Sequence, residues 1–396
     1  MSEFASFNRD GQNLEIYLKG RIDSTSAPIV EKEILEEAHD VTSAVIDCTD
    51  LEYLSSAGLR VILRLKKSVP NLSIINTSTS VYDIFQVTGF TEMINIRKAF
   101  RHISVKGCDI IGSGANGIVY RYDDENVVKV FRNPNALPEI EREQDLARTA
   151  FVLGVPTAIS YDIVQVDDGL YGSVFELLNA DSYHTLLLSG RKTIDDIAMM
   201  TAELLKIVHG TRPKPGKLPS KKDITIRQIG YIDQYLSPET FAKLKEMFEA
   251  IPENGHMLHA DCHMKNVLVQ NEESLLIDMD TLCVGDPIFE FSGLYSPYVG
   301  FDEIDPGDSE RFFGLPKGAT RDLFDKILDI YCDHNQEQVD QLMAKLRIVT
   351  YARFLYYCAV DKHIHGEKIP VAVNFCVSKI EELLPEVEDL SSHIVY

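Results

Sequence analysis

The sequence predicts two domains of different fold class: a small α/β domain at about residues 1–100 and a larger α+β domain at about residues 103–396. In the first hundred residues, short strand-like runs alternate with segments of helical spacing, which is typical of an α/β layer. β-type runs dominate residues 103–178, whereas residues 179–396 are mostly helical in pattern. We therefore expect the larger domain to have two lobes, an antiparallel sheet lobe followed by a helical lobe.

Composition places the chain among globular proteins and excludes several other classes. The 396 residues are 45% hydrophobic, which suffices for two or three domains. No run of about 18 apolar residues occurs, and the amino terminus lacks the basic and apolar regions of a secretory signal. Seven cysteines without a C-x-x-C pair indicate neither a disulfide framework nor a structural zinc site. We therefore expect a cytoplasmic protein that does not bind a membrane.

The net charge of the chain limits the classes of partner that it can bind. A net charge of −22 excludes nucleic acid, because binding to a phosphate backbone needs a basic surface. An acidic surface can steer a cationic substrate, or it can simply be solvated. The helical part holds five clustered acids, here called the acidic run, which could receive an amine-bearing ligand or form a solvated loop: Asp302, Glu303, Asp305, Asp308 and Glu310.

The elements of the first domain follow from periodicity. A serine pair, Ser55 and Ser56, is placed to cap the start of one helix. The expected strands span residues 13–18 continued by 20–23, 43–47, 72–75 and 93–96. The expected helices span residues 26–38, 56–65 and 81–87.

Three segments of this domain carry a family resemblance: D-S-T-S at Asp23–Ser26, A-V-I-D at Ala44–Asp47 and L-S-S-A-G-L-R at Leu54–Arg60. Through them, residues 5–100 resemble the STAS domain of bacterial anti-sigma factor antagonists. The resemblance implies a protein partner and a phosphorylated serine at the helix start that switches partner binding. Ser56 is the better positional match, with Ser55 next to it. Ordinary helix capping is the alternative role of this serine pair.

A glycine-rich loop opens the larger domain, with Gly112, Gly114 and Gly117 in the pattern G-x-G-x-x-G. A dinucleotide-binding loop would open a helix, whereas this one runs into the β-type segment 118–120. Lys129 follows in a second β-type run, where its ammonium could reach phosphates beneath a glycine flap. The context therefore favours a kinase-type nucleotide site.

Two further segments complete the predicted nucleotide site. A helix at about residues 138–151 carries several acids, one of which should pair with Lys129, and Glu143 is our choice. The segment from Glu176 to Leu178 joins the sheet-rich part to the helical part. Its exposed backbone could hydrogen-bond to an adenine.

The stretch 259–287 carries the predicted chemistry. Two apolar segments flank a polar turn at residues 271–273, which is a hairpin signature. Such a hairpin would bring Asp261, Asn266 and Asp278 together. Their oxygen ligands suit Mg²⁺, and one carboxylate could orient and deprotonate a hydroxyl, as phosphoryl transfer requires.

Three motifs in this stretch carry the second resemblance: H-A-D-C-H-M-K-N at His259–Asn266, I-D at Ile277–Asp278 and G-D-P at Gly285–Pro287. Residues 103–380 look like the aminoglycoside phosphotransferase and choline kinase branch of the protein-kinase-like fold. The resemblance implies Asp261 as the base, Asn266 and Asp278 on Mg²⁺, and Lys129 on the α- and β-phosphates of ATP. Protein kinases carry a lysine two residues after the catalytic aspartate, where this chain has His263.

Together these observations predict an ATP- and Mg²⁺-dependent phosphotransferase. Its acceptor would be a hydroxyl of a small molecule such as an aminoglycoside, a sugar or a choline-like compound, with the STAS domain regulating the enzyme, docking a partner or forming a homodimer. The glycine loop is close to the protein-kinase pattern. The alternative is therefore a protein serine kinase or nucleotide-binding pseudokinase that acts on Ser56 or gates the STAS domain.

Overall fold

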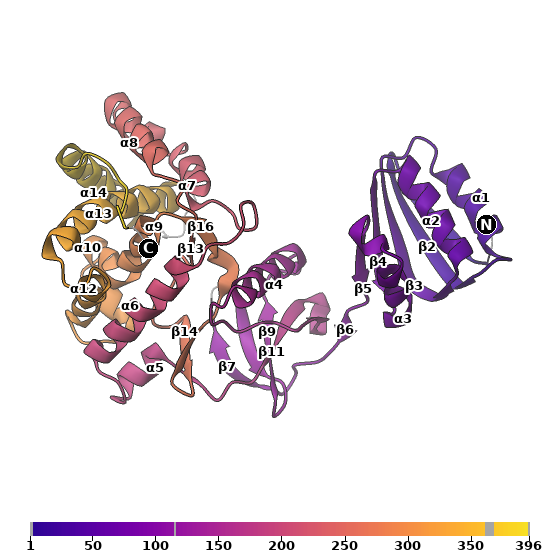
Figure 1. Ribbon diagram of the computed structural model, residues 1–396, viewed down its shortest axis with the longest axis horizontal. Coiled ribbons are helices and arrows are strands. Elements are labelled where there is room, and N and C mark those ends of the chain that lie inside the picture. Colours follow the sequence, from indigo (N-terminus) through magenta and orange to yellow (C-terminus); the bar gives the residue numbers. More distant parts are fainter. Residues whose placement is uncertain (1–2, 115, 361–367, 395–396) are drawn as a thin grey trace. The chain divides into compact units, whose positions relative to one another are not determined.

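The computed structural model describes residues 3–114, 116–360 and 368–394, so Ala115 of the glycine-rich loop lies outside the described residues. The chain forms two compact units, Met1–Ser104 with Val164–Asp167, and Val105–Ile163 with Asp168–Tyr396 (Figure 1). The segment Val164–Asp167 belongs to the first unit because β6 (Arg101–His102) pairs in parallel with two residues of β10. Each unit has its own hydrophobic core.

The first unit is built on a five-stranded sheet in the order β1-β2-β3-β4-β5. β1 and β2 are antiparallel, and the other neighbouring pairs are parallel. The strands are β1 (Ala5–Asp10), β2 (Asn13–Ile22), β3 (Ser43–Leu54), β4 (Asn71–Thr77) and β5 (Asn95–Lys98), and the helices are α1 (Ala27–Glu37), α2 (Ser56–Ser68) and α3 (Thr79–Val87). This arrangement confirms the predicted α/β class.

Several strands differ from the sequence prediction, and β3 extends to Leu54 instead of ending at residue 47. β1 was not expected; a tight turn at Gly11, with φ of 58°, returns the chain so that Asp10 pairs with Asn13. The last strand begins at residue 95, two residues later than expected. The backbone N–H of Ile94 donates to the Phe90 carbonyl at 2.9 Å, which keeps these residues in a helical turn.

The start of α2 combines a cap with close packing. The Ser55 hydroxyl accepts hydrogen bonds from the backbone N–H groups of Ala57 at 3.2 Å and Gly58 at 3.4 Å. A Cβ at Gly58 would lie 2.5 Å from a methyl carbon of Leu54 and 3.2 Å from the Ile22 carbonyl oxygen, so a larger residue would force these neighbours to shift. Ser56, the first helical residue, is exposed.

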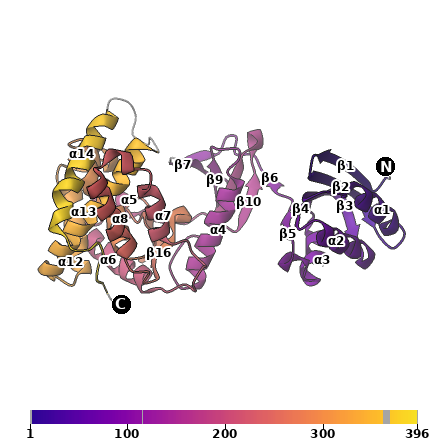
Figure 2. The ribbon, with the colours of Figure 1, turned by 90° about the horizontal axis from the view of Figure 1, so that it is seen from above.

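The second unit begins with a sheet lobe in which β7-β8-β9-β11 are neighbours in antiparallel pairs. This confirms the predicted antiparallel sheet lobe. Helix α4 runs alongside these strands (Figure 2). The elements are β7 (Asp109–Ser113), β8 (Gly117–Arg121), β9 (Asn126–Phe131), α4 (Leu137–Val152) and β11 (Tyr171–Glu176), with β10 (Asp162–Gln165), whose last two residues belong to the first unit.

The remainder of the second unit is the predicted helical lobe. Its helices are α5 (Tyr183–Leu188), α6 (Ile194–Gly210), α7 (Lys221–Ile229), α8 (Pro238–Ala250), α9 (Ile288–Tyr295), α10 (Phe301–Ile304), α11 (Asp308–Phe313), α12 (Ala319–Tyr331), α13 (Gln336–Ala359) and α14 (Lys368–Leu383). Its strands are β12 (Asp181–Ser182), β13 (His256–Leu258), β14 (Val267–Gln270), β15 (Glu273–Leu276) and β16 (Cys283–Gly285). Within the described parts of the chain, every helix is too short or too polar to cross a membrane.

The predicted hairpin is present as β14 and β15. Gln270 pairs with Glu273, and the two residues between them, Asn271 and Glu272, have φ of 51° and 69°. Two consecutive positive φ values match the twist of antiparallel strands in a two-residue turn. The hairpin thereby brings the segment before β14 beside the residues that follow β15.

Candidate active site

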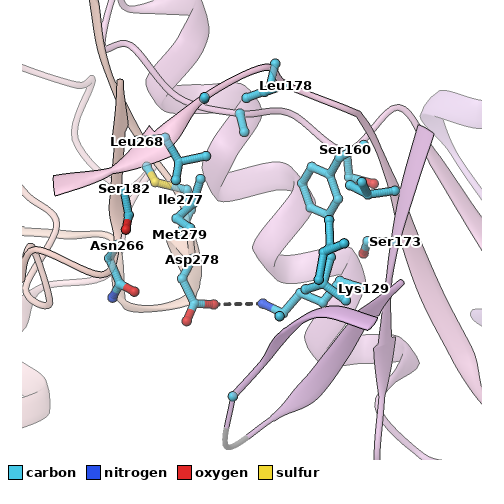
Figure 3. Close-up of a pocket in the computed structure, with 18 of the residues that line it drawn as sticks. Lys129, Ser160, Ser173, Leu178, Ser182, Asn266, Leu268, Ile277, Asp278 and Met279 are labelled. Atoms are coloured by element: carbon cyan, nitrogen blue, oxygen red, sulfur yellow. Dashed lines mark hydrogen bonds and ion pairs between the residues drawn. The ribbon is translucent and has the colours of Figure 1, made fainter. Parts of the chain in front are cut away.

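A cavity of about 580 Å³ lies between the sheet lobe and the helical lobe of the second unit (Figure 3). Nine of the residues predicted from the sequence line it: Gly112, Gly114, Gly117, Lys129, Glu143, Glu176, Leu178, Asn266 and Asp278. Asp261 is not among the lining residues and lies beside the cavity, in contact with Asn266.

Lys129, on β9, joins three segments at the cavity. Its Nζ lies 3.0 Å from Oε1 and 3.2 Å from Oε2 of Glu143 on α4, and 2.7 Å from Oδ1 of Asp278. Figure 3 shows the side chains of Lys129 and Asp278 pointing toward each other. The acid chosen from the sequence as the partner of Lys129 therefore contacts it, together with a residue 149 positions further along the chain.

Burial and charge act in opposite directions on this network. Burial lowers the pKa of Lys129, but the carboxylates of Glu143 and Asp278 more than offset this and leave the pKa above its ordinary value. Burial also raises the pKa of Glu143, and the ammonium of Lys129 offsets part of that increase. For Asp280, burial and the nearby charges of Asp278 and Glu143 raise the pKa to about 6. The site therefore holds more acid than Lys129 neutralises.

The glycine loop is closed by its own backbone. The Gly114 N–H donates to the Gly117 carbonyl at 2.9 Å. A Cβ at Gly117 would lie 2.5 Å from the Val130 carbonyl oxygen, so β8 approaches β9 at a distance that only glycine permits. This packing places the end of the loop beside β9, the strand that carries Lys129, with Gly117 opposite Phe131.

The segment between the lobes leaves β11 at the cavity. Glu176 pairs with Asn126 in the sheet, and the Leu177 N–H donates to the Glu125 carbonyl at 2.6 Å. These bonds hold the backbone from Glu176 to Leu178 along the cavity wall, where we expected an adenine to bind.

Asn266 links the predicted base to the predicted metal site. Its Nδ2 donates to Asp261 Oδ2 at 2.9 Å and to the Asp261 carbonyl at 3.0 Å. Because the amide nitrogen is used in this way, the amide oxygen remains as the ligand atom. Its side chain and that of Asp278 lie on the same side of the cavity in Figure 3.

These residues fit a magnesium ion. Mg²⁺ is usually held by one or two protein oxygens together with water and substrate phosphates. Asp278 has a second carboxylate oxygen beyond the one that meets Lys129, and Asn266 supplies an amide oxygen. No cluster of three or more His, Cys, Asp or Glu placed to hold a metal occurs in the described parts of the chain, so the phosphates would have to complete the coordination.

Strained backbone at two points shapes the site. Ala260, next to Asp261, has φ of 66°, and its N–H donates to Oε2 of the fully buried Glu290 at 2.8 Å. Asp278 has φ of 62°. The buried ring of His259 links the two segments, because its Nε2 donates to the Ile277 carbonyl at 3.1 Å. Left-handed non-glycine residues persist only when such contacts hold them.

Sequence reasoning missed Glu290 and did not assign a role to Asp286 of the G-D-P motif. Asp286 is buried and accepts from Ile288 N at 2.9 Å, Ser392 N at 3.0 Å, Asn254 Nδ2 at 3.2 Å and Ser391 Oγ at 3.2 Å. It therefore fixes the carboxyl-terminal segment to the start of α9, which carries Glu290. An acid inside an otherwise apolar helix was the available signal for Glu290.

Comparison with known proteins identifies a family for each unit. Residues 108–319 match the model of the phosphotransferase enzyme family, and residues 6–103 match that of the STAS domain. The anti-sigma-B factor antagonist of Listeria monocytogenes serovar 1/2a is 29% identical over 96 residues, covering 22% of this chain and 82% of that protein. The anti-sigma-B factor antagonist of Bacillus subtilis strain 168 is 27% identical over 88 residues, covering 21% and 81%.

Solved structures resemble the chain more distantly. An ADP-bound aminoglycoside phosphotransferase, APH(2'')-Ib, is 15% identical with a TM-score of 0.48, covering 76% of this chain and 98% of that one. The aminoglycoside phosphotransferase APH(4)-Ia is 16% identical with a TM-score of 0.48, covering 69% and 93%. Similarity at this level does not identify a substrate.

Proposed function

Because this chain belongs to the phosphotransferase enzyme family and is an ATP-dependent phosphotransferase, we propose that its cavity transfers the γ-phosphoryl group of ATP to a hydroxyl of a small molecule. One observation carries the proposal. The ion pair of Lys129 with Asp278 and the hydrogen bond of Asn266 with Asp261 converge on one cavity, although the residues come from distant segments.

Asp261 is the base in this proposal. The acceptor oxygen attacks the γ-phosphorus, the bond from that phosphorus to the bridging oxygen of ADP breaks, and the hydroxyl proton passes to the Asp261 carboxylate. The Asp261 side chain is 41% exposed, so an acceptor can reach it. The hydrogen bond from Asn266 Nδ2 fixes the orientation of the carboxylate.

Lys129, the glycine loop and the metal site hold the nucleotide. In this proposal Lys129, which Glu143 contacts, binds the phosphates, and the backbone of Glu176 to Leu178 at the cavity wall binds the adenine. Asn266 and Asp278 would hold Mg²⁺, which supplies charge neutralisation at the phosphates when bound. Catalysis then comes mainly from positioning and from electrostatic stabilisation of the transferred group.

The test compares Asp261→Asn with Lys129→Met. Asparagine keeps the size of the side chain and an oxygen for the bond from Asn266, so Mg·ADP should bind nearly as in the wild type while phosphoryl transfer is lost. Lys129→Met should weaken nucleotide binding itself. Calorimetric titration with Mg·ADP and assays of ADP formation over a library of hydroxyl compounds measure both effects. Wild-type turnover by Asp261→Asn would rule out the proposed base.

We propose that the STAS domain regulates the phosphotransferase or docks a protein partner. Ser55 is occupied as the helix cap, whereas Ser56 is exposed at the first helical position, so Ser56 is the serine that a kinase could reach. A phosphate there would add charge at a helix amino terminus, where it is favourable. Intact mass after incubation with Mg·ATP tests self-phosphorylation, and an adduct that persists in Ser56→Ala would exclude this site.

A further inference from the structure

Lys265, between the predicted base and the predicted metal ligand Asn266, is a half-buried cation that has no anionic partner in the described part of the chain. Its Nζ donates to the Phe312 carbonyl at 2.7 Å and lies 4.0 Å from the centre of the Phe312 ring. Among the described residues, no carboxylate oxygen lies within 4.0 Å of this ammonium. Lys129 in the same cavity, by contrast, is paired with two carboxylates.

The ammonium lies on the side of the base that faces α11. His263 Nε2 is 3.7 Å from Asp261 Oδ2, and the His263 ring centre is 6.1 Å from that of Phe312. Phe312 is 42% exposed, and its ring lies next to Lys265 as well as next to the residue that neighbours the base. Burial lowers the pKa of His263, so this ring adds little positive charge. Lys265 and Asp261 therefore flank the same pair of rings, Lys265 at Phe312 and Asp261 at His263.

Each acid of the acidic run already has a hydrogen-bond or ion-pair partner within the fold. Glu303 accepts hydrogen bonds from the hydroxyls of Tyr295 at 2.8 Å and Tyr351 at 2.7 Å. It also lies 3.8 Å from Arg321 and 3.9 Å from Arg347. This acid is therefore neutralised inside the helical lobe, with its side chain only 17% exposed.

The other four acids of the run are also used within the fold. Arg311 contacts Asp305 at 2.9 Å and Asp308 at 3.1 Å. Asp302 accepts from a backbone N–H at 2.8 Å, and Glu310 accepts from another at 2.6 Å. These contacts organise the turn before α11 and α11 itself, while the side chains of Asp305 and Asp308 remain 33% and 45% exposed.

We infer that the acceptor of this phosphotransferase is an anionic hydroxyl compound, whose carboxylate or phosphate oxygen pairs with Lys265 while its hydroxyl reaches Asp261. The inference rests on the proposed function and narrows its substrate class. An anion would give Lys265 a charge-assisted hydrogen bond in place of the neutral Phe312 carbonyl. A polyamine would instead place its ammonium groups beside an uncompensated ammonium. Phe312, which is partly exposed, offers apolar surface to the acceptor.

The experiment uses acceptors matched in skeleton and different in charge. One set is gluconate, glucose 6-phosphate, glucose and glucosamine, and the other is glycerate, glycerol and choline. The full chain is assayed with Mg·ATP for transfer to each, and for hydrolysis of ATP without acceptor. We expect kcat/KM for the anionic members to exceed that of the neutral and cationic members by about tenfold or more. Comparison of gluconate and glycerate with glucose 6-phosphate shows whether a carboxylate or a phosphate is preferred.

Three variants test whether Lys265 causes the preference for anionic acceptors. Lys265→Met, whose apolar stem can still cover Phe312, should raise KM for the anionic acceptor about tenfold or more with a smaller change in kcat, and Lys265→Arg should restore KM. Lys245→Met, at an exposed lysine of α8 that pairs with Glu249, is the matched control and should change neither. Binding of Mg·ADP should stay within about twofold in all three.

The outcomes separate the inference from the proposed function. Preferred turnover of a cationic member, or hydrolysis of ATP without transfer to any anionic member, overturns the inference and leaves the phosphotransferase site intact. A Lys265→Met variant that loses only Mg·ADP affinity overturns it as well, because the lysine would then serve the nucleotide. Absence of both transfer and hydrolysis contradicts the proposed function itself.

Discussion

Replacing Glu143 by glutamine is expected to weaken nucleotide binding and phosphoryl transfer together. The glutamate contacts Lys129 Nζ through both carboxylate oxygens, at 3.0 and 3.2 Å. Glutamine keeps the shape of the side chain and one acceptor oxygen but removes the negative charge. Lys129 then has Asp278 as its remaining carboxylate partner, at 2.7 Å. The lysine should shift toward Asp278 and compete with the metal for that carboxylate.

The size of the effect follows from burial. The side chains of Lys129 and Glu143 are 15% and 10% exposed, so solvent screens their attraction only weakly. A hydrogen bond to a charged group in such a setting contributes about 1.5–3 kcal/mol. Removing one partner of a buried pair costs more than this when the other charge is left alone, but Asp278 keeps Lys129 paired. We therefore expect kcat/KM for Mg·ATP to fall roughly 10- to 150-fold.

Calorimetric titration with Mg·ADP and steady-state kinetics measure the two parts of this loss. Glu139→Gln, at an exposed acid in the first turn of the same helix, is the matched control and should behave as the wild type. A Glu143→Gln variant with unchanged Mg·ADP affinity and unchanged kcat/KM would refute the assigned role of the pair. Unfolding temperatures of both variants, measured alongside, separate loss of function from loss of structure.

Three other predictions concern stability. Without metal or nucleotide, Asp280→Asn should raise the unfolding temperature above pH 6 and leave it unchanged near pH 4. The folded protein holds a proton on this acid up to about pH 6, whereas the unfolded chain releases it near pH 3.9. The stability of the wild type therefore falls as the pH rises between these values. Scanning calorimetry in chelator checks this, and an equal difference at both pH values would contradict it. Ser55→Ala should weaken α2 by about 1 kcal/mol and Ser56→Ala by much less, because Ser55 alone caps the helix; hydrogen exchange of α2 amides measures both. Asp286→Ala leaves buried donors unsatisfied and should cost at least about 3 kcal/mol, with faster proteolysis of the carboxyl-terminal segment; a wild-type digestion pattern would exclude that clamp.

Features that depend on a few neighbouring residues were accessible from the sequence. The β14–β15 hairpin follows from two apolar runs around a polar turn, and its Asn271-Glu272 corner adopts the positive φ values that a two-residue turn requires. The glycine pattern followed by β-type residues indicated a loop that runs into a strand, and Gly117 begins β8 beside the strand of Lys129. The alternation of strands and helices likewise predicted the α/β class of the first unit.

The tertiary structure alone decided which charges are paired. Glu143 is the one acid among its helix neighbours that is buried toward Lys129, and Glu290 reaches the strained residue before Asp261 from a helix thirty positions further along the chain. Packing likewise decided that Asp305, Asp308 and Glu303 contact arginines, whereas Lys265 meets no carboxylate within 4.0 Å among the described residues. Local patterns determine backbone geometry because it depends on adjacent residues, whereas the pairing of a charge depends on which distant segments the whole fold brings within a few ångströms of it.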